Sequence, residues 1–222
     1  MEKFLLIGGI AALVIGLIAL VAWVEHKRKK AIEALFTSRG DSIWIKPTQE
    51  QKAAALDAIG NPPELKDGPG GVKWAAEAAT AKPPLWIVEH SYSRGAGKSR
   101  RTYTHTMVVT PVPPTWATTA ITRVTLWNKL QGLLGKKGMQ LDSEAFNKAF
   151  QVTTDDENFA LVLLTPALQE WLLSTPRDWS IRVTQGLLQV YVPRATAVKL
   201  LPPMLDAPAQ ILARTTPELF AA

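Results

Sequence analysis

The chain has 222 residues, a net charge of +6 at pH 7 and no cysteine. The absence of cysteine excludes disulfides, thiolate zinc sites, iron–sulfur clusters and a cysteine nucleophile. The first 30 residues hold five basic and two acidic residues, so the rest of the chain carries only +3, too little for a dedicated nucleic-acid binder.

An uncharged run from Phe4 to Val24 dominates the N-terminus. As a helix its 21 residues would reach about 31 Å, close to the thickness of a bilayer's hydrocarbon core. A cleaved signal peptide is the alternative, since Lys3 precedes the run, but the sequence up to Trp23 offers no clean small-x-small cleavage site. We therefore expect residues 1–30 to form a transmembrane anchor with a basic juxtamembrane segment.

The flanking charges predict how this anchor is oriented. Lys3 is the only basic residue before the run, whereas Lys27, Arg28, Lys29 and Lys30 follow it. The positive-inside rule then predicts a single-pass protein of the inner membrane of the cell, with its N-terminus outside and its C-terminal domain in the cytoplasm. The four basic residues are candidates for contact with anionic lipid or a partner.

Small residues recur within the run at Gly8, Ala12 and Gly16, a spacing of four. Such a stripe lets a second helix backbone approach closely, so these three residues are candidate membrane-helix contacts. The alternative is that glycine and alanine are simply common in membrane helices. The expected partners are the bilayer itself and a membrane protein or a second copy of the chain.

Residues 31–60 read as a stem helix and a short helix. The stem ends near Gly40, Ser42 to Ile45 reads as a brief strand, and Thr48 caps a helix that ends at Gly60. Residues 61–84 read as a loop-rich connector, since Asn61 to Gly71 is rich in proline and glycine.

Residues 85–222 read as one soluble α+β domain. Leu85–Ser93 and Arg101–Pro111 alternate with period two and predict a hairpin around residues 94–100. Further expected elements are a strand over 121–127, a strand or helix over 128–134, a helix from Asp142 to Phe150, a strand over 151–153, helices from about 155 and from Thr165 to Ser174, a hairpin over 181–192, and a helical tail broken at Pro202, Pro203 and Pro208. Strands first and helices later predict an antiparallel sheet with packed helices.

Several short motifs lie along the chain. They are Phe146-Asn147-Lys148-Ala149-Phe150-Gln151-Val152, Asp156, Phe159-Ala160, Leu164-Thr165-Pro166 and Glu170-Trp171-Leu172, with Ala31-Ile32-Glu33-Ala34-Leu35 and Arg39-Gly40 in the stem and Thr106-Met107-Val108-Val109 in the hairpin. In this order the chain resembles a group of uncharacterised actinobacterial single-pass membrane proteins that carry a cytoplasmic domain of unknown function. The resemblance implies topology and fold, and it brings no catalytic residues with it.

The expected hairpin tip carries the densest charge of the domain: Arg94, Lys98, Arg100 and Arg101. Such a tip is suited to anionic lipid headgroups or to an acidic partner protein, and it is equally typical of a solvated edge. Because no aromatic ladder accompanies the charges, we expect no nucleic acid as a partner. Gly97-Lys98-Ser99 is no phosphate loop, because Tyr92 stands where that motif needs glycine and a strand follows.

His90 and His105 lie symmetrically about the tip, as do Tyr92 and Tyr103. If the histidines pair across the strands, the tyrosines pair too, on the same face. Two imidazoles are too few for zinc, and the only other histidine is His26, so neither a metal nor another cofactor is expected.

No catalytic constellation is present, because the chain has no nucleophile elbow and no His-Glu-x-x-His helix. The prediction is therefore a non-enzymatic protein, an accessory or scaffold component of a membrane complex. The alternatives are a sensor of anionic lipid or a small ligand that uses the face around His90, Tyr92, Tyr103 and His105, and an unrecognised hydrolase.

Overall fold

The computed structural model describes residues 2–60, 71–79, 81–124 and 138–220, and in its first helix the side chains from Leu13 onward. The chain divides into two compact units, Met1–Gly40 and Asp41–Ala222. The first unit contains a single helix, and the second contains every strand of the described residues.

The first unit is one continuous helix, α1 (Glu2–Arg39), which joins the predicted anchor and stem. It ends at Gly40, whose φ of +75° falls in the left-handed region that glycine adopts without strain. Within the described residues no helix is both long enough and apolar enough to cross a membrane, so the span predicted over 4–24 is not confirmed.

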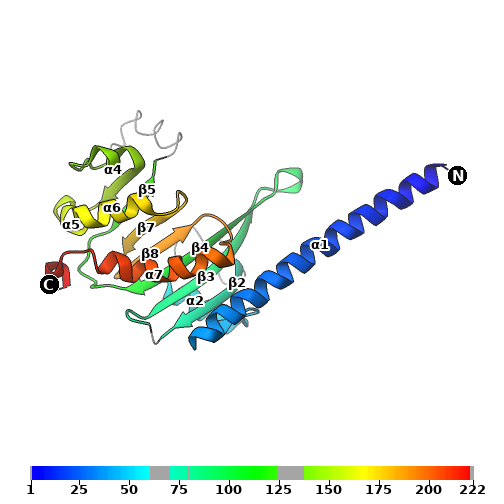
Figure 1. The fold of residues 1–222 in the computed structure, drawn as a ribbon, viewed down its shortest axis with the longest axis horizontal. Coiled ribbons are helices and arrows are strands. Elements are labelled where there is room, and N and C mark those ends of the chain that lie inside the picture. Colours follow the sequence, from blue (N-terminus) through cyan, green and yellow to red (C-terminus); the bar gives the residue numbers. More distant parts are fainter. Residues whose placement is uncertain (1, 61–70, 80, 125–137, 221–222) are drawn as a thin grey trace. The chain divides into compact units, whose positions relative to one another are not determined.

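The second unit is built on one antiparallel sheet of eight strands in the order β1-β2-β3-β4-β8-β7-β5-β6 (Figure 1). The strands are β1 (Ser42–Trp44), β2 (Val72–Ala78), β3 (Leu85–Arg94), β4 (Arg101–Pro111), β5 (Thr119–Arg123), β6 (Phe150–Thr154), β7 (Ser180–Thr184) and β8 (Leu187–Val192). The predicted α+β class with an antiparallel sheet and helices is thereby confirmed.

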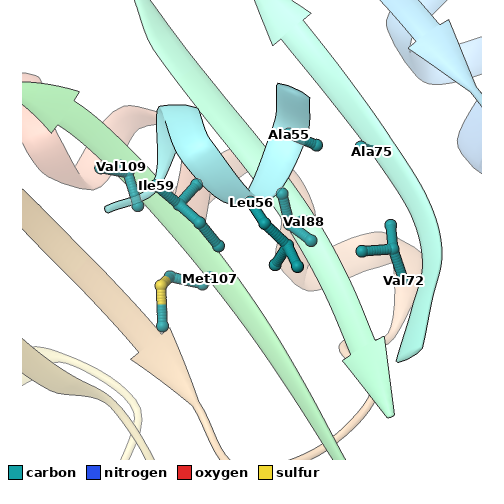
Figure 2. Packing of buried hydrophobic residues seen from close by; sticks show 8 residues of the cluster. All are labelled: Ala55, Leu56, Ile59, Val72, Ala75, Val88, Met107 and Val109. Atoms are coloured by element: carbon teal, nitrogen blue, oxygen red, sulfur yellow. The ribbon is translucent and has the colours of Figure 1, made fainter. Parts of the chain in front are cut away.

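One face of the sheet is covered by α2 (Gln49–Ala58). Thr48 begins this helix with a capping box, in which its hydroxyl accepts from the Gln51 backbone N–H and the Gln51 side chain accepts from the Thr48 backbone N–H. The helix and the residue after it contribute Ala55, Leu56 and Ile59 to a buried cluster with Val72, Ala75, Val88, Met107 and Val109 (Figure 2). Burial of these side chains is the main force that holds α2 on the strands.

The opposite face packs against α7 (Leu201–Leu212), which lies along β4 and β8 (Figure 1). Thr106, the neighbour of Met107 in β4, points to this side: its hydroxyl donates to the Arg194 carbonyl and accepts from the Thr196 backbone N–H. The Thr196 hydroxyl in turn lies 3.9 Å from the Met204 sulfur. Strand alternation thus gives one face to each helix.

Three short helices flank β6 in the chain. They are α4 (Glu144–Ala149) before it, and α5 (Glu157–Leu163) and α6 (Pro166–Ser174) after it. Each begins at a side-chain cap, provided by Ser143, Asp156 and Thr165 respectively. Single turns of 3₁₀ helix occupy Gly97–Ser99, Val198–Leu200 and Pro217–Phe220.

Three predicted features differ from the structure. The connector over 61–84 contains strand β2, so the sheet begins before residue 85, while 61–70 lie outside the described residues. Pro208 lies inside α7, and Pro202 and Pro203 fall in its first turn, where no backbone N–H is required, so the tail is not broken. The cap of α4 is Ser143 rather than Asp142, and the element predicted over 128–134 also lies outside the described residues.

Candidate functional site

The β3–β4 hairpin extends beyond its neighbours in the sheet (Figure 1). Pairing with β2 ends at His90, and pairing with β8 ends at Thr106. Beyond these residues β3 and β4 pair only with each other in the described sheet, up to Arg94 opposite Arg101. At about 3.3 Å per residue, the four residues after His90 carry this two-stranded ribbon about 13 Å past the sheet.

The predicted register is confirmed: His90 lies opposite His105, and Tyr92 opposite Tyr103, on one face. Their rings form a stack centred on Tyr92, whose ring centroid is 5.3 Å from that of Tyr103 and 5.6 Å from that of His105. Tyr92 is only 8% exposed, whereas Tyr103 is 39% exposed. The stack therefore stiffens the ribbon from one side and presents a single aromatic ring to solvent.

The other face of the ribbon is a ladder of hydroxyl groups. Ser91 and Thr104 hydroxyls lie 2.7 Å apart, and those of Ser93 and Thr102 lie 3.3 Å apart. Cross-strand hydroxyl pairs of this kind add to the strand pairing.

The tip is closed by a compact turn. Gly95 has a φ of +84°, and a side chain there would come within 2.6 Å of the Ser99 carbonyl. The Ser99 hydroxyl donates to the Ala96 carbonyl at 2.8 Å. As predicted, a strand follows Gly97-Lys98-Ser99: β4 begins at Arg101, where a phosphate loop needs a helix.

The structure brings all four predicted tip residues together at this end of the ribbon. We call Arg94, Lys98, Arg100 and Arg101 the basic hairpin end; every one is exposed. Arg94 lies directly across from Arg101, and the Arg94 guanidinium is 5.7 Å from the Tyr92 ring centroid. Like charges directly opposite each other destabilise a strand pair, so an anion bound between them would relieve this repulsion.

The predicted membrane-helix and lipid contacts lie on α1, in the first unit. Lys27 and Lys30 are exposed, Arg28 and Lys29 are half-buried, and the Lys27 ammonium lies 4.0 Å from the Trp23 ring centroid. A side chain at Gly16 would meet no atom within 4 Å. Gly8 and Ala12 lie outside the residues whose side chains are described.

The aromatic stack differs from what the sequence predicts for the surroundings of the tip charges. The sequence predicts no aromatic ladder beside the tip charges, yet Tyr92, Tyr103 and His105 form one. Single-stranded nucleic acid needs exposed rings on which bases stack, and among these three only Tyr103 offers a substantially exposed one. The prediction that nucleic acid is no partner stays a prediction.

Metal ligands do not gather in the described part of the chain. No cluster of three or more histidine, aspartate or glutamate side chains is placed to hold a metal there. His90 is 1% exposed and packs against Gly71, where an added side chain would lie 2.3 Å from the imidazole. This histidine is therefore part of the packing beneath the ribbon.

One feature that sequence reasoning missed is a groove of about 340 Å³ beside α4, α5 and α6. Its lining includes Asp142, Glu170, Leu161 and Leu173. The sequence signal for this groove is a surplus of carboxylates in this part of the chain. Helix capping does not account for the surplus, because only Asp156 caps one of these three helices.

No protein-family model, curated protein or solved structure matches the chain.

Proposed function

We propose that the protein is a non-catalytic accessory component of a membrane complex that binds an acidic partner surface through its basic hairpin end. The observation that carries this proposal is the exposed end of the ribbon, with four basic residues, no acidic residue between 91 and 104, and a stiff aromatic stack beneath it. Exposed charge on a rigid, projecting element is suited to recognition, because little conformational freedom is lost on binding.

Membrane attachment is the second part of the proposal. It rests on the uncharged run over 4–24 and on the basic residues that follow it at 27–30, the pattern of an anchor with its large domain in the cytoplasm.

Co-purification tests the proposal. The full chain, tagged at its C-terminus and extracted in mild detergent, is expected to elute with one dominant partner. Replacing Arg94, Lys98, Arg100 and Arg101 by alanine should lower the amount of that partner by about tenfold, since several contacts to charged groups are lost together.

A matched control separates this effect from a general change of charge. Lys46, Lys73, Lys82 and Lys199 are also exposed, and their replacement by alanine removes the same four charges from other parts of the sheet unit. The control variant should retain the partner. A chain that elutes as a lone monomer, or equal losses in the two variants, would contradict the proposal.

A further inference from the structure

Two regions of the sheet unit carry opposite charge. The basic hairpin end supplies four positive charges. Residues 138–174, which include α4, β6, α5 and α6, hold six carboxylates and a single lysine, a net charge of −5 in a chain whose total is +6. The six are Asp142, Glu144, Asp155, Asp156, Glu157 and Glu170.

The groove beside α4, α5 and α6 is the concave part of this acidic region. Asp142 and Glu170 line it together with Leu161 and Leu173. Leu161 is 53% and Leu173 is 36% exposed, so the groove offers open apolar surface as well as two carboxylates. A fitting occupant presents cationic groups on long aliphatic stems, which cover leucine side chains while their charged ends reach the carboxylates.

We propose that the basic hairpin end of one copy docks in the acidic groove of a second copy. This inference rests on the proposed function, because it names the acidic surface that the hairpin binds. Arginine and lysine stems would pack on Leu161 and Leu173, and their charged groups would pair with Asp142 and Glu170. The chain itself thus supplies both complementary surfaces.

The contact joins two copies, because the hairpin end does not reach the groove of its own chain. In the sheet, β4 is separated from β6 by β8, β7 and β5, which is four spacings of about 4.8 Å, or about 19 Å. The ribbon also extends away from the sheet, and α4 lies elsewhere in the unit (Figure 1). Because the contact joins two different surfaces, its repetition produces a dimer with two such contacts, a closed ring or an open row of copies.

Cysteine cross-linking tests this contact directly, because the natural chain has no cysteine. The full chain carrying Ala96→Cys at the tip and Leu161→Cys in the groove should form disulfide-linked dimers and larger species in mild detergent. A control chain carries Ala96→Cys with Ala53→Cys, an exposed position on α2. Equal linking of the two pairs would overturn the proposal.

Salt and charge reversal make the test specific. Raising the salt from about 0.05 to 0.5 M should reduce the linking about fivefold, because exposed charges are then screened. The first chain has a reversed groove (Asp142→Lys, Glu170→Lys) and carries Ala96→Cys at its natural tip. The second chain has a reversed tip (Arg94→Glu, Lys98→Glu, Arg100→Glu, Arg101→Glu) and carries Leu161→Cys in its natural groove. These two chains should link to each other, since the pair keeps one natural tip and one natural groove. Absence of that link would overturn the proposal.

The remaining outcomes distinguish this inference from the proposed function. If the tip and groove cysteines do not link, yet the four-alanine variant loses a co-purifying protein, self-docking is wrong and the proposed function stands. If they do not link, and the hairpin residues are needed only for flotation with phosphatidylglycerol vesicles, the hairpin binds lipid and both proposals are wrong.

Discussion

Arg123 shows how one charged side chain can hold several elements together. From β5 its guanidinium donates to the backbone carbonyls of Leu172 and Thr175 at 3.0 and 2.8 Å, and it lies 4.1 Å from the Phe150 ring centroid. Burial lowers the pKa of Arg123, and the positive charge of Arg177 lowers it further. The contacts join β5, β6 and the end of α6, beside the groove.

The change Arg123→Met should therefore destabilise the sheet unit by about 2 kcal/mol, because hydrogen bonds from a charged donor to half-buried carbonyls are lost while the aliphatic stem is kept. Urea denaturation followed by tryptophan fluorescence measures this difference. Arg177→Met is the matched control: it removes an exposed charge that repels Arg123, and we expect a change within about 0.5 kcal/mol. Equal destabilisation by the two variants would argue against the role of Arg123.

At the scale of elements, the ribbon depends on its aromatic stack, because beyond His90 and Thr106 no further strand of the described sheet supports it. Tyr92→Ala removes three ring contacts, with His90, Tyr103 and His105, and the contact with Arg94. The local free energy of opening should fall by about 2 kcal/mol, which is roughly a 30-fold faster amide exchange over 91–104. Hydrogen exchange read by mass spectrometry should show little change over 85–90.

Ser93→Ala provides the comparison on the other face of the same ribbon. It removes the 3.3 Å contact with the Thr102 hydroxyl, which is exposed, so exchange over 91–104 should rise less than about threefold. If both variants open the ribbon equally, the stack is not what stiffens it.

The sequence predicts those elements whose signal is local. The symmetry of residues about a turn sets the register of the β3–β4 hairpin. The hairpin predicted over 181–192 is formed by β7 and β8, which turn at Gln185-Gly186 with φ of 52° and 72°. Strand β2 was missed because Trp74, Ala75 and Ala76 are buried in succession and give no alternation. Alanine also has a low preference for strands.

The candidate site was likewise predictable only where its signal is local in the sequence. Its four basic residues are close together in the sequence, so they could be named in advance. The stack on Tyr92 requires the register of the strands. The groove requires Asp142, which precedes α4, to line the same hollow as Glu170 of α6. Contacts between elements far apart in the chain depend on tertiary packing, which periodicity does not encode.

For the whole molecule, the distribution of charge matters more than its total. The net charge of +6 hides a basic segment after the apolar run, a basic hairpin end and a segment of charge −5 over 138–174. A chain with separated surfaces of opposite sign favours ordered contacts between copies over non-specific attraction to any polyanion.

Attachment to a membrane is the prediction that concerns the entire chain. The prediction rests on the uncharged run from Phe4 to Val24, whose 21 residues match the length that a membrane-spanning helix needs. The full protein should remain in the membrane fraction after extraction with alkaline carbonate. The double change Ile15→Glu and Ile18→Glu should release it, because a charged residue near the centre of a span costs about 3 kcal/mol.

Leu161→Glu with Leu173→Glu is the appropriate control for that experiment. Both leucines are exposed apolar residues of the sheet unit, and the substitutions add the same two charges without touching α1. This variant should stay with the membranes, because its uncharged run is intact. Release of the unaltered chain by carbonate would mean that the apolar run holds the protein by peripheral contact or not at all, and the predicted topology would then be wrong.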